Sequence, residues 1–236
     1  MRRIITLHVL MFYLAGAGAA DVPVLSGREI LSHCVIAGQL APMPWGVKVT
    51  TGDASAIACR AFLGAVNDAH EFHVSSTRIT PRYCLPPKIS MDSVAIMLEQ
   101  RSLTIPPGDE SAGKYILDAY AAEYPCTEGT MTGMNAFSMT GEALLAACLP
   151  LVDMPVDIHD ITAHGERNLC LGYIAGAVDS LADLQSEPAW CLADDHADMG
   201  RLVNTVTRYL QTHAETLAGN AAAVIDAALK ETLPCK

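Results

Sequence analysis

Eight cysteines are the residues whose type and spacing most clearly indicate chemistry in this 236-residue sequence. They form two sets of four: Cys34, Cys59, Cys84 and Cys126, then Cys148, Cys170, Cys191 and Cys235. Zinc sites, thioredoxin-like redox motifs and haem attachment sites usually contain close pairs such as C-x-x-C, and no two cysteines here lie within three residues of each other. The even number and matching spacings therefore favour structural disulfides, as in proteins that fold in an oxidising compartment.

Helix geometry narrows the choice of disulfide pairs. In each set the third cysteine precedes one predicted helix and the fourth ends the next. An antiparallel helix pair brings those ends within the roughly 5–6 Å between Cα atoms that a disulfide needs. Other pairings stay open, because this many cysteines allow on the order of a hundred connectivities. The predicted pairs are Cys84–Cys126 and Cys191–Cys235, which leaves Cys34–Cys59 and Cys148–Cys170.

The sequence around the two sets of cysteines also matches. Cys59 opens the segment CRAFLGAVNDA, and Cys170 opens CLGYIAGAVDS. Further matched positions are Asp68 and Asp179, Tyr83 and Trp190, and the Pro-Cys pairs that end at Cys126 and Cys235. Agreement at so many positions over a period of roughly 110 residues predicts two diverged copies of one module, residues 21–132 and 133–236.

Apolar periodicity predicts the helices of these copies. Apolar residues recur at three- and four-residue steps from Met199 to Leu210, and a second run continues from Leu217 to Leu233 until Pro234 stops it. In the first copy a shorter helix over Ala112–Glu123 is stopped by Pro125. No alternating strand pattern of any length occurs, so the expected fold is all-α, with about four helices in each disulfide-bonded copy.

Small residues lie inside the helices predicted after Cys59 and Cys170, as Gly64-Ala65 and Ala175-Gly176. A glycine inside a helix costs about 1 kcal/mol relative to alanine unless something benefits from the missing side chain. Close helix crossing is the usual beneficiary. We therefore expect these helices to cross a neighbour closely, which would let the two copies pack together as a pseudo-dimer within one chain.

The N-terminal segment has the three parts of a secretory signal peptide. Arg2 and Arg3 precede the largely apolar stretch Ile4–Leu14, and Ala17-Gly18-Ala19 fits the small-x-small pattern of a cleavage site. We expect residues 1–20 to be removed on export and the rest of the chain to be periplasmic. No later stretch offers the roughly 18 uninterrupted apolar residues of a spanning helix, so no membrane insertion is expected after cleavage.

Two clusters of ionisable residues could suggest a metal site or a catalytic site. They are His159 and His164 with Asp157, Asp160 and Glu166, and Asp194, Asp195 and Asp198 with His196. The first matches no helical metal motif and is typical of a polar surface loop. The second directly precedes a helix, where acids cap N–H groups and complement the helix dipole. Since no nucleophile elbow, Walker loop or dinucleotide motif occurs, we expect neither an enzyme nor a cofactor.

The order of these motifs resembles the Rap/Tai-type immunity proteins of type VI secretion. The second copy carries the resemblance over nearly its whole length: Cys170–Asp179, Trp190-Cys191, Arg208-Tyr209-Leu210 and Leu233-Pro234-Cys235. The resemblance implies a periplasmic helical protein that is no enzyme itself, but binds a cognate effector, typically a peptidoglycan amidase, and blocks its active site. A general periplasmic binding or chaperone-like module without a dedicated effector is the alternative.

Charge suggests which copy docks a partner. The formal net charge of −11 makes nucleic acid and anionic membrane surfaces poor partners. Residues 21–132 contain 8 basic and 12 acidic residues, whereas residues 133–236 contain 5 and 14. Cell-wall-binding effectors often carry basic surfaces, so electrostatic complementarity favours the second copy. The candidate partner-binding residues are Asp153, Asp157, Asp160, Asp194 and Asp195.

Overall fold

The computed structural model describes residues 25–40, 51–87, 89–127, 138–153, 167–192 and 198–235, and within them the chain is helical. The helices are α1 (Gly27–Leu40), α2 (Thr51–Thr77), α3 (Met91–Ser102), α4 (Ala112–Glu123), α5 (Gly141–Cys148), α6 (Asn168–Leu184), α7 (Met199–Thr212) and α8 (Ala221–Thr232). Two short 3₁₀ turns, Leu149–Leu151 and Ala214–Thr216, complete them. These segments contain isolated β-bridges but no strand, so the all-α prediction is confirmed. The predicted signal peptide, residues 1–20, lies outside the described residues.

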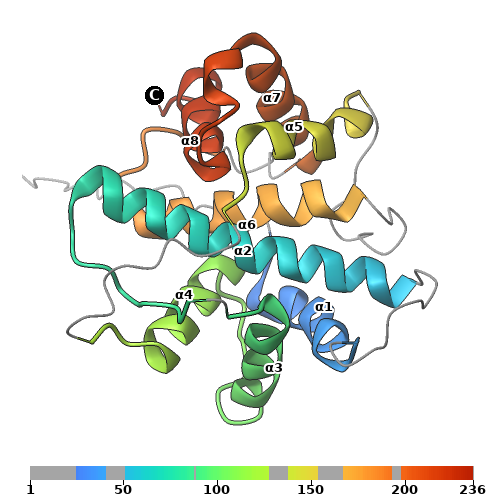
Figure 1. The fold of residues 1–236 in the computed structure, drawn as a ribbon, viewed down its shortest axis with the longest axis vertical. Helices are drawn as coiled ribbons and strands as arrows, with labels where there is room; N and C mark the ends of the chain where they lie inside the picture. Colours follow the sequence, from blue (N-terminus) through green and yellow to red (C-terminus); the bar gives the residue numbers. More distant parts are fainter. Residues whose placement is uncertain are drawn as a thin grey trace, which may run out of the picture.

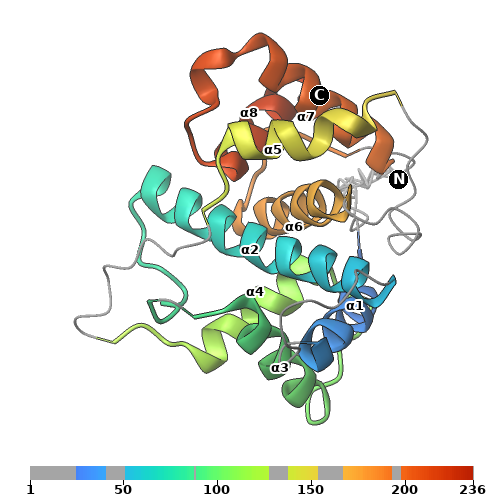
Figure 2. The same cartoon turned by 45° about the vertical axis from the view of Figure 1, so that its right-hand side comes forward.

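The helices form three layers (Figures 1 and 2). The long helices α2 and α6 lie side by side in the middle layer and make the most extensive helix–helix contact of the described fold. Helices α1, α3 and α4 cover one side of this pair, and α5, α7 and α8 cover the other. Both sides contribute to one continuous apolar core, so the N-terminal half (α1–α4) and the C-terminal half (α5–α8) are packed as a single unit.

Helices α2 and α6 run in the same direction and touch at positions four residues apart on each helix. The side-chain amide of Asn168 donates to the Ala54 carbonyl at 2.9 Å. One turn later, a Cβ placed on Gly172 would lie 2.3 Å from the carbonyl oxygen of Ala58. After a further turn, a Cβ on Gly176 would lie 2.6 Å from the carbonyl oxygen of Phe62. Ridges of residues four apart are a common way for helices to interdigitate, and here only glycine fits the contact.

The expectation of close crossing is therefore correct for Gly176 and wrong for Gly64. A Cβ on Gly64 would meet no atom within 4 Å outside its own helix and chain neighbours. The two glycines lie in matched sequence segments, but only Gly176 faces the other long helix. Helical periodicity alone does not show which of two adjacent small residues faces the neighbouring helix.

Each half contains two disulfides, and none of the four crosses between the halves among the described residues. Cys34–Cys59 and Cys148–Cys170 tie the first helix of a half to its second, with Cα atoms 5.0 and 5.1 Å apart. Cys84–Cys126 and Cys191–Cys235 close the third and fourth helices, with Cα atoms 4.9 Å apart in both. This is the connectivity that the antiparallel-helix argument predicts.

Helix bounds agree with the periodicity except near the C-terminus. The predicted helix over Ala112–Glu123 coincides with α4. The predicted start at Leu217 is wrong, because Asn220 begins α8 by accepting the backbone N–H groups of Ala222 and Ala223 at 2.8 and 3.2 Å. An N-cap of this kind outweighs apolar residues that precede it. Helices α4 and α8 are consequently equal in length, at 12 residues each.

Two buried acids on the central helices hold the opposite half. Asp68 Oδ2 accepts the Met139 backbone N–H at 2.9 Å and the Tyr173 hydroxyl at 2.6 Å, and both donors belong to the C-terminal half. Asp179 Oδ2 accepts the backbone N–H of Leu25, just before α1, at 3.4 Å. Each acid thus binds the residue that leads into the other half. These bonds add specific polar contacts to the apolar surface between the two halves.

Burial raises the pKa of Asp68 to about 7, although the hydrogen bonds from Tyr173 and Met139 act in the opposite direction. Its Oδ1 atom has no hydrogen-bond partner in the described part of the chain. Burial lowers the pKa of nearby His70 to about 4, assisted by the charge of Arg82. The His70 Nε2 atom accepts the Arg82 backbone N–H at 3.0 Å, and its ring stacks on Tyr83. Helix α2 therefore carries a buried acid, Asp68, and a buried base, His70, and burial favours the neutral form of each.

Candidate functional site

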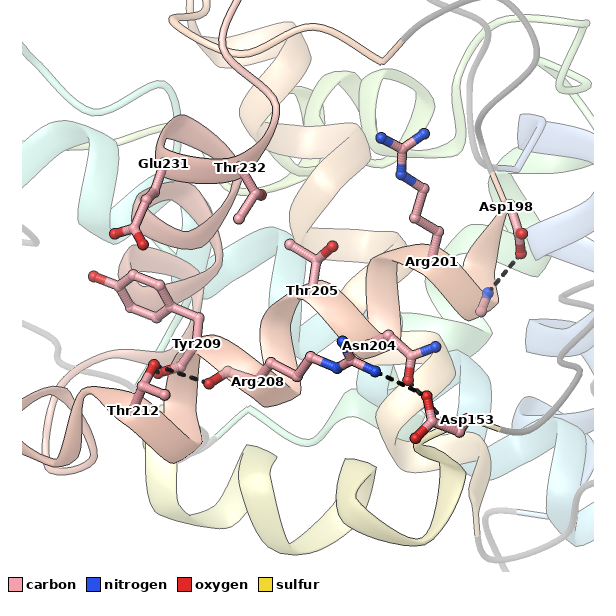
Figure 3. A pocket seen from close by; sticks show the side chains of 11 residues that line it. Asp153, Asp198, Arg201, Asn204, Thr205, Arg208, Tyr209, Thr212, Glu231 and Thr232 are labelled. Atoms are coloured by element: carbon pink, nitrogen blue, oxygen red, sulfur yellow. Dashed lines mark hydrogen bonds and ion pairs between the residues drawn. The ribbon is translucent and has the colours of Figure 1, made fainter.

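A groove of about 790 Å³ runs along the exposed face of α7 (Figure 3). The opposite face of α7 is buried against the core through Met199, Leu202, Val203, Val206 and Leu210. Residues between these positions therefore face outward, as the period of an amphipathic helix requires. The groove is lined from α7 by Gly200, Arg201, Asn204, Thr205, Arg208, Tyr209 and Thr212, from the preceding loops by Asp153 and Asp198, and from α8 by Glu231 and Thr232.

Asp153 forms one wall of the groove and is fixed to α7 by two bonds. Its backbone N–H donates to Asn204 Oδ1 at 2.9 Å, and its carboxylate pairs with Arg208 at 3.0 Å (Figure 3). The backbone of Asp153 is left-handed, with φ at 60°. Aspartate adopts this conformation more readily than most residues, and the two bonds hold it there. The turn after α5 is thereby positioned against α7.

The N-terminus of α7 forms another part of the groove. The Asp198 side chain caps the helix by accepting the Gly200 backbone N–H at 2.8 Å. The Arg201 side chain points away from Asp153 (Figure 3), and no ion pair joins Arg201 to another described residue. This end of the groove therefore presents both a carboxylate and a guanidinium group.

An aromatic pair lies at the C-terminus of α7. The rings of Tyr209 and His213 stack with centroids 4.0 Å apart and an interplanar angle of 15°. The His213 Nε2 atom lies 3.9 Å from the Glu231 carboxylate of α8. Of the two rings only that of Tyr209 lines the groove, and the stacking on His213 holds it in place.

The two aspartates that line the groove both have partners within the described structure. The Asp153 carboxylate is paired with a guanidinium and that of Asp198 caps a helix, so neither is poised to abstract a proton from a ligand. No group of three His, Cys, Asp or Glu side chains that could hold a metal ion occurs among the described residues. No helix in the described ranges is long and apolar enough to cross a membrane.

The structure places one of the five predicted partner-binding acids in the groove. Asp153 lies there, but its charge is partly neutralised by Arg208. Asp157, Asp160, Asp194 and Asp195 lie outside the described residues, as do the histidines His159, His164 and His196. Asp198, expected to act at a helix start, is the N-cap of α7.

Sequence reasoning missed most of the groove. Arg201, Asn204, Thr205 and Thr212 occupy the outward positions between the apolar residues of α7, so the same periodicity could have found them. Tyr209 is half-buried, because it packs against the apolar core and also lines the groove. Asp153 and Glu231 come from other elements, and no local pattern connects them with α7.

The described residues thus form a disulfide-bonded helical protein with a polar groove along α7. Residues 140–235 match the family model described as Rap1a immunity proteins. Over these residues the match confirms the resemblance that the cysteine motifs carry. The matched stretch spans α5 to α8 and contains every groove residue that the structure describes. Comparisons with curated proteins and with solved structures gave no match.

Proposed function

We propose that this chain is a periplasmic immunity protein that binds and inhibits an effector of a type VI secretion system, with a peptidoglycan amidase as the target. The observation that carries the proposal is the family match over residues 140–235, which includes the whole described groove. An immunity protein of this family is expected to act on a protein partner and to need no catalytic group of its own.

The disulfides support the proposed compartment. All eight cysteines are paired, and such bridges persist in oxidising compartments such as the bacterial periplasm. The signal-like segment at residues 1–20 predicts delivery to the same place. An inhibitor located there would meet a hydrolase where peptidoglycan is cut.

We assign partner docking to the groove and to the acidic segments that adjoin it in the sequence. Asp157 and Asp160 follow Asp153, and Asp194 and Asp195 precede Asp198, so both groups are close in sequence to groove residues. Clustered acids attract a basic protein surface and accelerate its association. The C-terminal half would therefore contribute most of the docking energy.

The packing of the N-terminal half against the C-terminal half supports the proposal that the chain is an intrachain pseudo-dimer of two diverged copies. The central helices α2 and α6 pack in parallel, and Asp68 and Asp179 make corresponding bonds to Met139 and Leu25. If the two copies are fused, each copy covers the dimer surface of the other, and no second chain is needed. Sedimentation should accordingly show a monomer at micromolar concentration, and a stable dimer of the full chain would contradict this proposal.

Rescue from toxicity tests the proposed function. A peptidoglycan hydrolase encoded beside this chain's gene would be directed to the periplasm, with and without co-expression of the chain. Rescue of growth, together with inhibition of the purified hydrolase on peptidoglycan, is the expected result. If neighbouring hydrolases remain toxic and active while the chain protects unrelated unfolded proteins from aggregation, the chaperone-like alternative replaces the immunity proposal.

Removing one charged side chain from the groove should weaken binding to the hydrolase that the rescue experiment identifies. The variant Asp153→Asn keeps a residue that tolerates the left-handed backbone but removes the carboxylate charge. We expect effector affinity to fall about fivefold at low salt, and less at high salt because the interaction is screened. Isothermal titration calorimetry at two salt concentrations measures this difference.

Asp109→Asn provides the matched control. Asp109 also forms an exposed ion pair with an arginine, Arg28, but in the N-terminal half. This variant should bind the effector as the unmodified chain does. Equal affinities for both variants would remove Asp153 from the docking surface.

A further inference from the structure

A second hollow, of about 330 Å³, lies beside the central helix pair and is lined mainly by apolar side chains. It is formed by α2, the start of α3, Met139 and the first turns of α6, so residues from both halves meet there. A volume of this size is at the lower end of the range for ligand pockets. Its apolar lining includes Ile57, Ala61, Met91, Met139 and Leu169.

Gly64 of α2 lines the hollow, and its missing side chain leaves space there. A Cβ on Gly64 would meet nothing within 4 Å beyond its own helix and chain neighbours, whereas Gly172 and Gly176 are required for close helix contact. Glycine weakens a helix relative to alanine, and no packing partner accounts for it here. At the matched position α6 carries Ala175, which is fully buried. The opening at Gly64 is thus a local feature that helix packing does not explain.

An ion pair at the mouth of the hollow determines which polar group fits there. Arg60 and Asp92 pair through Arg60 Nε and one Asp92 oxygen, with 37% and 30% of their side chains exposed. The other guanidinium nitrogens and the second carboxylate oxygen have no partner among the described residues. A donor and an acceptor therefore lie side by side. A peptide group, with one C=O and one N–H, matches both.

Charged end groups fit this mouth less well than a neutral peptide group does. A carboxylate placed there would meet Asp92, and an ammonium group would meet Arg60. Each would gain one favourable contact and one repulsive contact, which is how a binding site discriminates between ligands. The lining methionines, Met91 and Met139, are flexible enough to fit aliphatic or aromatic side chains.

We propose that this hollow binds an apolar side chain presented by a protein partner, with the partner's adjoining peptide group bound at Arg60 and Asp92. The identity of the partner rests on the proposed function. If the chain is an immunity protein, the effector supplies that side chain. The hollow then forms a second contact point, separate from the polar groove on α7. It involves both halves of the chain, since Met139 and Leu169 belong to the C-terminal half.

Binding of N-acetyl-leucinamide to the full oxidised chain tests the proposal. This probe combines an apolar side chain with neutral peptide groups, and ¹³C-methyl signals of Met91 and Met139 report its arrival by NMR. We expect saturable shifts of both signals in the millimolar range, as suits so small a ligand. The acid 4-methylpentanoate and the cation 3-methylbutylammonium carry the same kind of apolar group and should bind at least fivefold more weakly.

Two variants assign the shifts to this hollow. Gly64→Leu fills it and should abolish the shifts, while Gly64→Ala, which adds a single methyl group, should reduce them only in part. Thermal unfolding of each variant confirms that it is folded. The proposal is overturned if the amide gives no saturable shift, if acid or amine binds as tightly, or if Gly64→Leu still responds. Because no effector takes part, such a failure leaves the rescue experiment unaffected.

Discussion

Replacing Gly172 by alanine is expected to lower the free energy of unfolding by about 2 kcal/mol. The added Cβ would lie 2.3 Å from the carbonyl oxygen of Ala58 and 3.0 Å from its Cα, so α2 and α6 must separate. These atoms belong to the backbone of a long helix and cannot rotate away as a flexible side chain would. The expected loss outweighs the roughly 1 kcal/mol by which alanine normally favours a helix over glycine.

Gly64→Ala is the control for this substitution and should have the opposite sign. It makes the same chemical change on the partner helix, where the new methyl group meets no neighbour within 4 Å. We expect a gain of about 0.5–1 kcal/mol from helix propensity alone. Urea unfolding followed by circular dichroism, with disulfides intact, measures both. If Gly172→Ala is as stable as Gly64→Ala, the close contact between α2 and α6 does not exist in solution.

The buried acid Asp68 and the buried base His70, both on α2, predict two opposite effects of pH on stability. Asp68 has a pKa near 7 in the folded chain, against about 3.9 when unfolded. Its protonated form favours folding, so this stabilisation is complete below about pH 4 and is lost as pH rises towards 7. His70 has a folded pKa near 4, against about 6.5 when unfolded. Its contribution is complete above about pH 6.5 and is lost as pH falls towards 4.

Between about pH 4 and 6.5 these two contributions oppose each other, and single substitutions should separate them. Each group changes the free energy of unfolding by up to about 1.4 kcal/mol per pH unit. In Asp68→Asn only the His70 effect remains, so stability should rise with pH relative to the unmodified chain. In His70→Gln only the Asp68 effect remains, and stability should fall with pH.

Urea unfolding at half-unit pH intervals gives the two slopes directly. Asp109→Asn, at a side chain that is 95% exposed, serves as the control and should follow the unmodified chain. Because only differences between variants and the unmodified chain are compared, other histidines such as His33 and His73 cancel. Parallel curves for all variants would show that Asp68 and His70 are not buried as the structure has them.

Much of this fold could be predicted from the sequence, because its strongest signals are local. The run that forms α4 ends at a proline, and the cysteine spacings restrict which helix ends can meet. The start of α8 was harder, since the cap at Asn220 competes with an apolar residue, Leu217, that continues the helical period. Local rules conflict there, and the hydrogen bonds of the cap decide.

The parallel crossing of α2 and α6 could not be derived in the same way. Small residues indicate that some helix approaches closely, but not which helix or in which direction. Gly64 and Gly176 illustrate this, because they lie in matched segments and have opposite surroundings. The groove was missed for a similar reason. Asp153 reaches Arg208 across 55 positions of sequence, and only the packing of the turn against α7 brings them together.

The order of the disulfides has a consequence for how the chain matures. Counting from the N-terminus, the first cysteine pairs with the second, the third with the fourth, and so on to the last. We propose that the chain is delivered across a membrane N-terminus first. An oxidase that joins each newly emerged cysteine to the preceding unpaired cysteine then produces the native set of disulfides directly. No disulfide shuffling is then required, so oxidation alone should mature the chain without an isomerase.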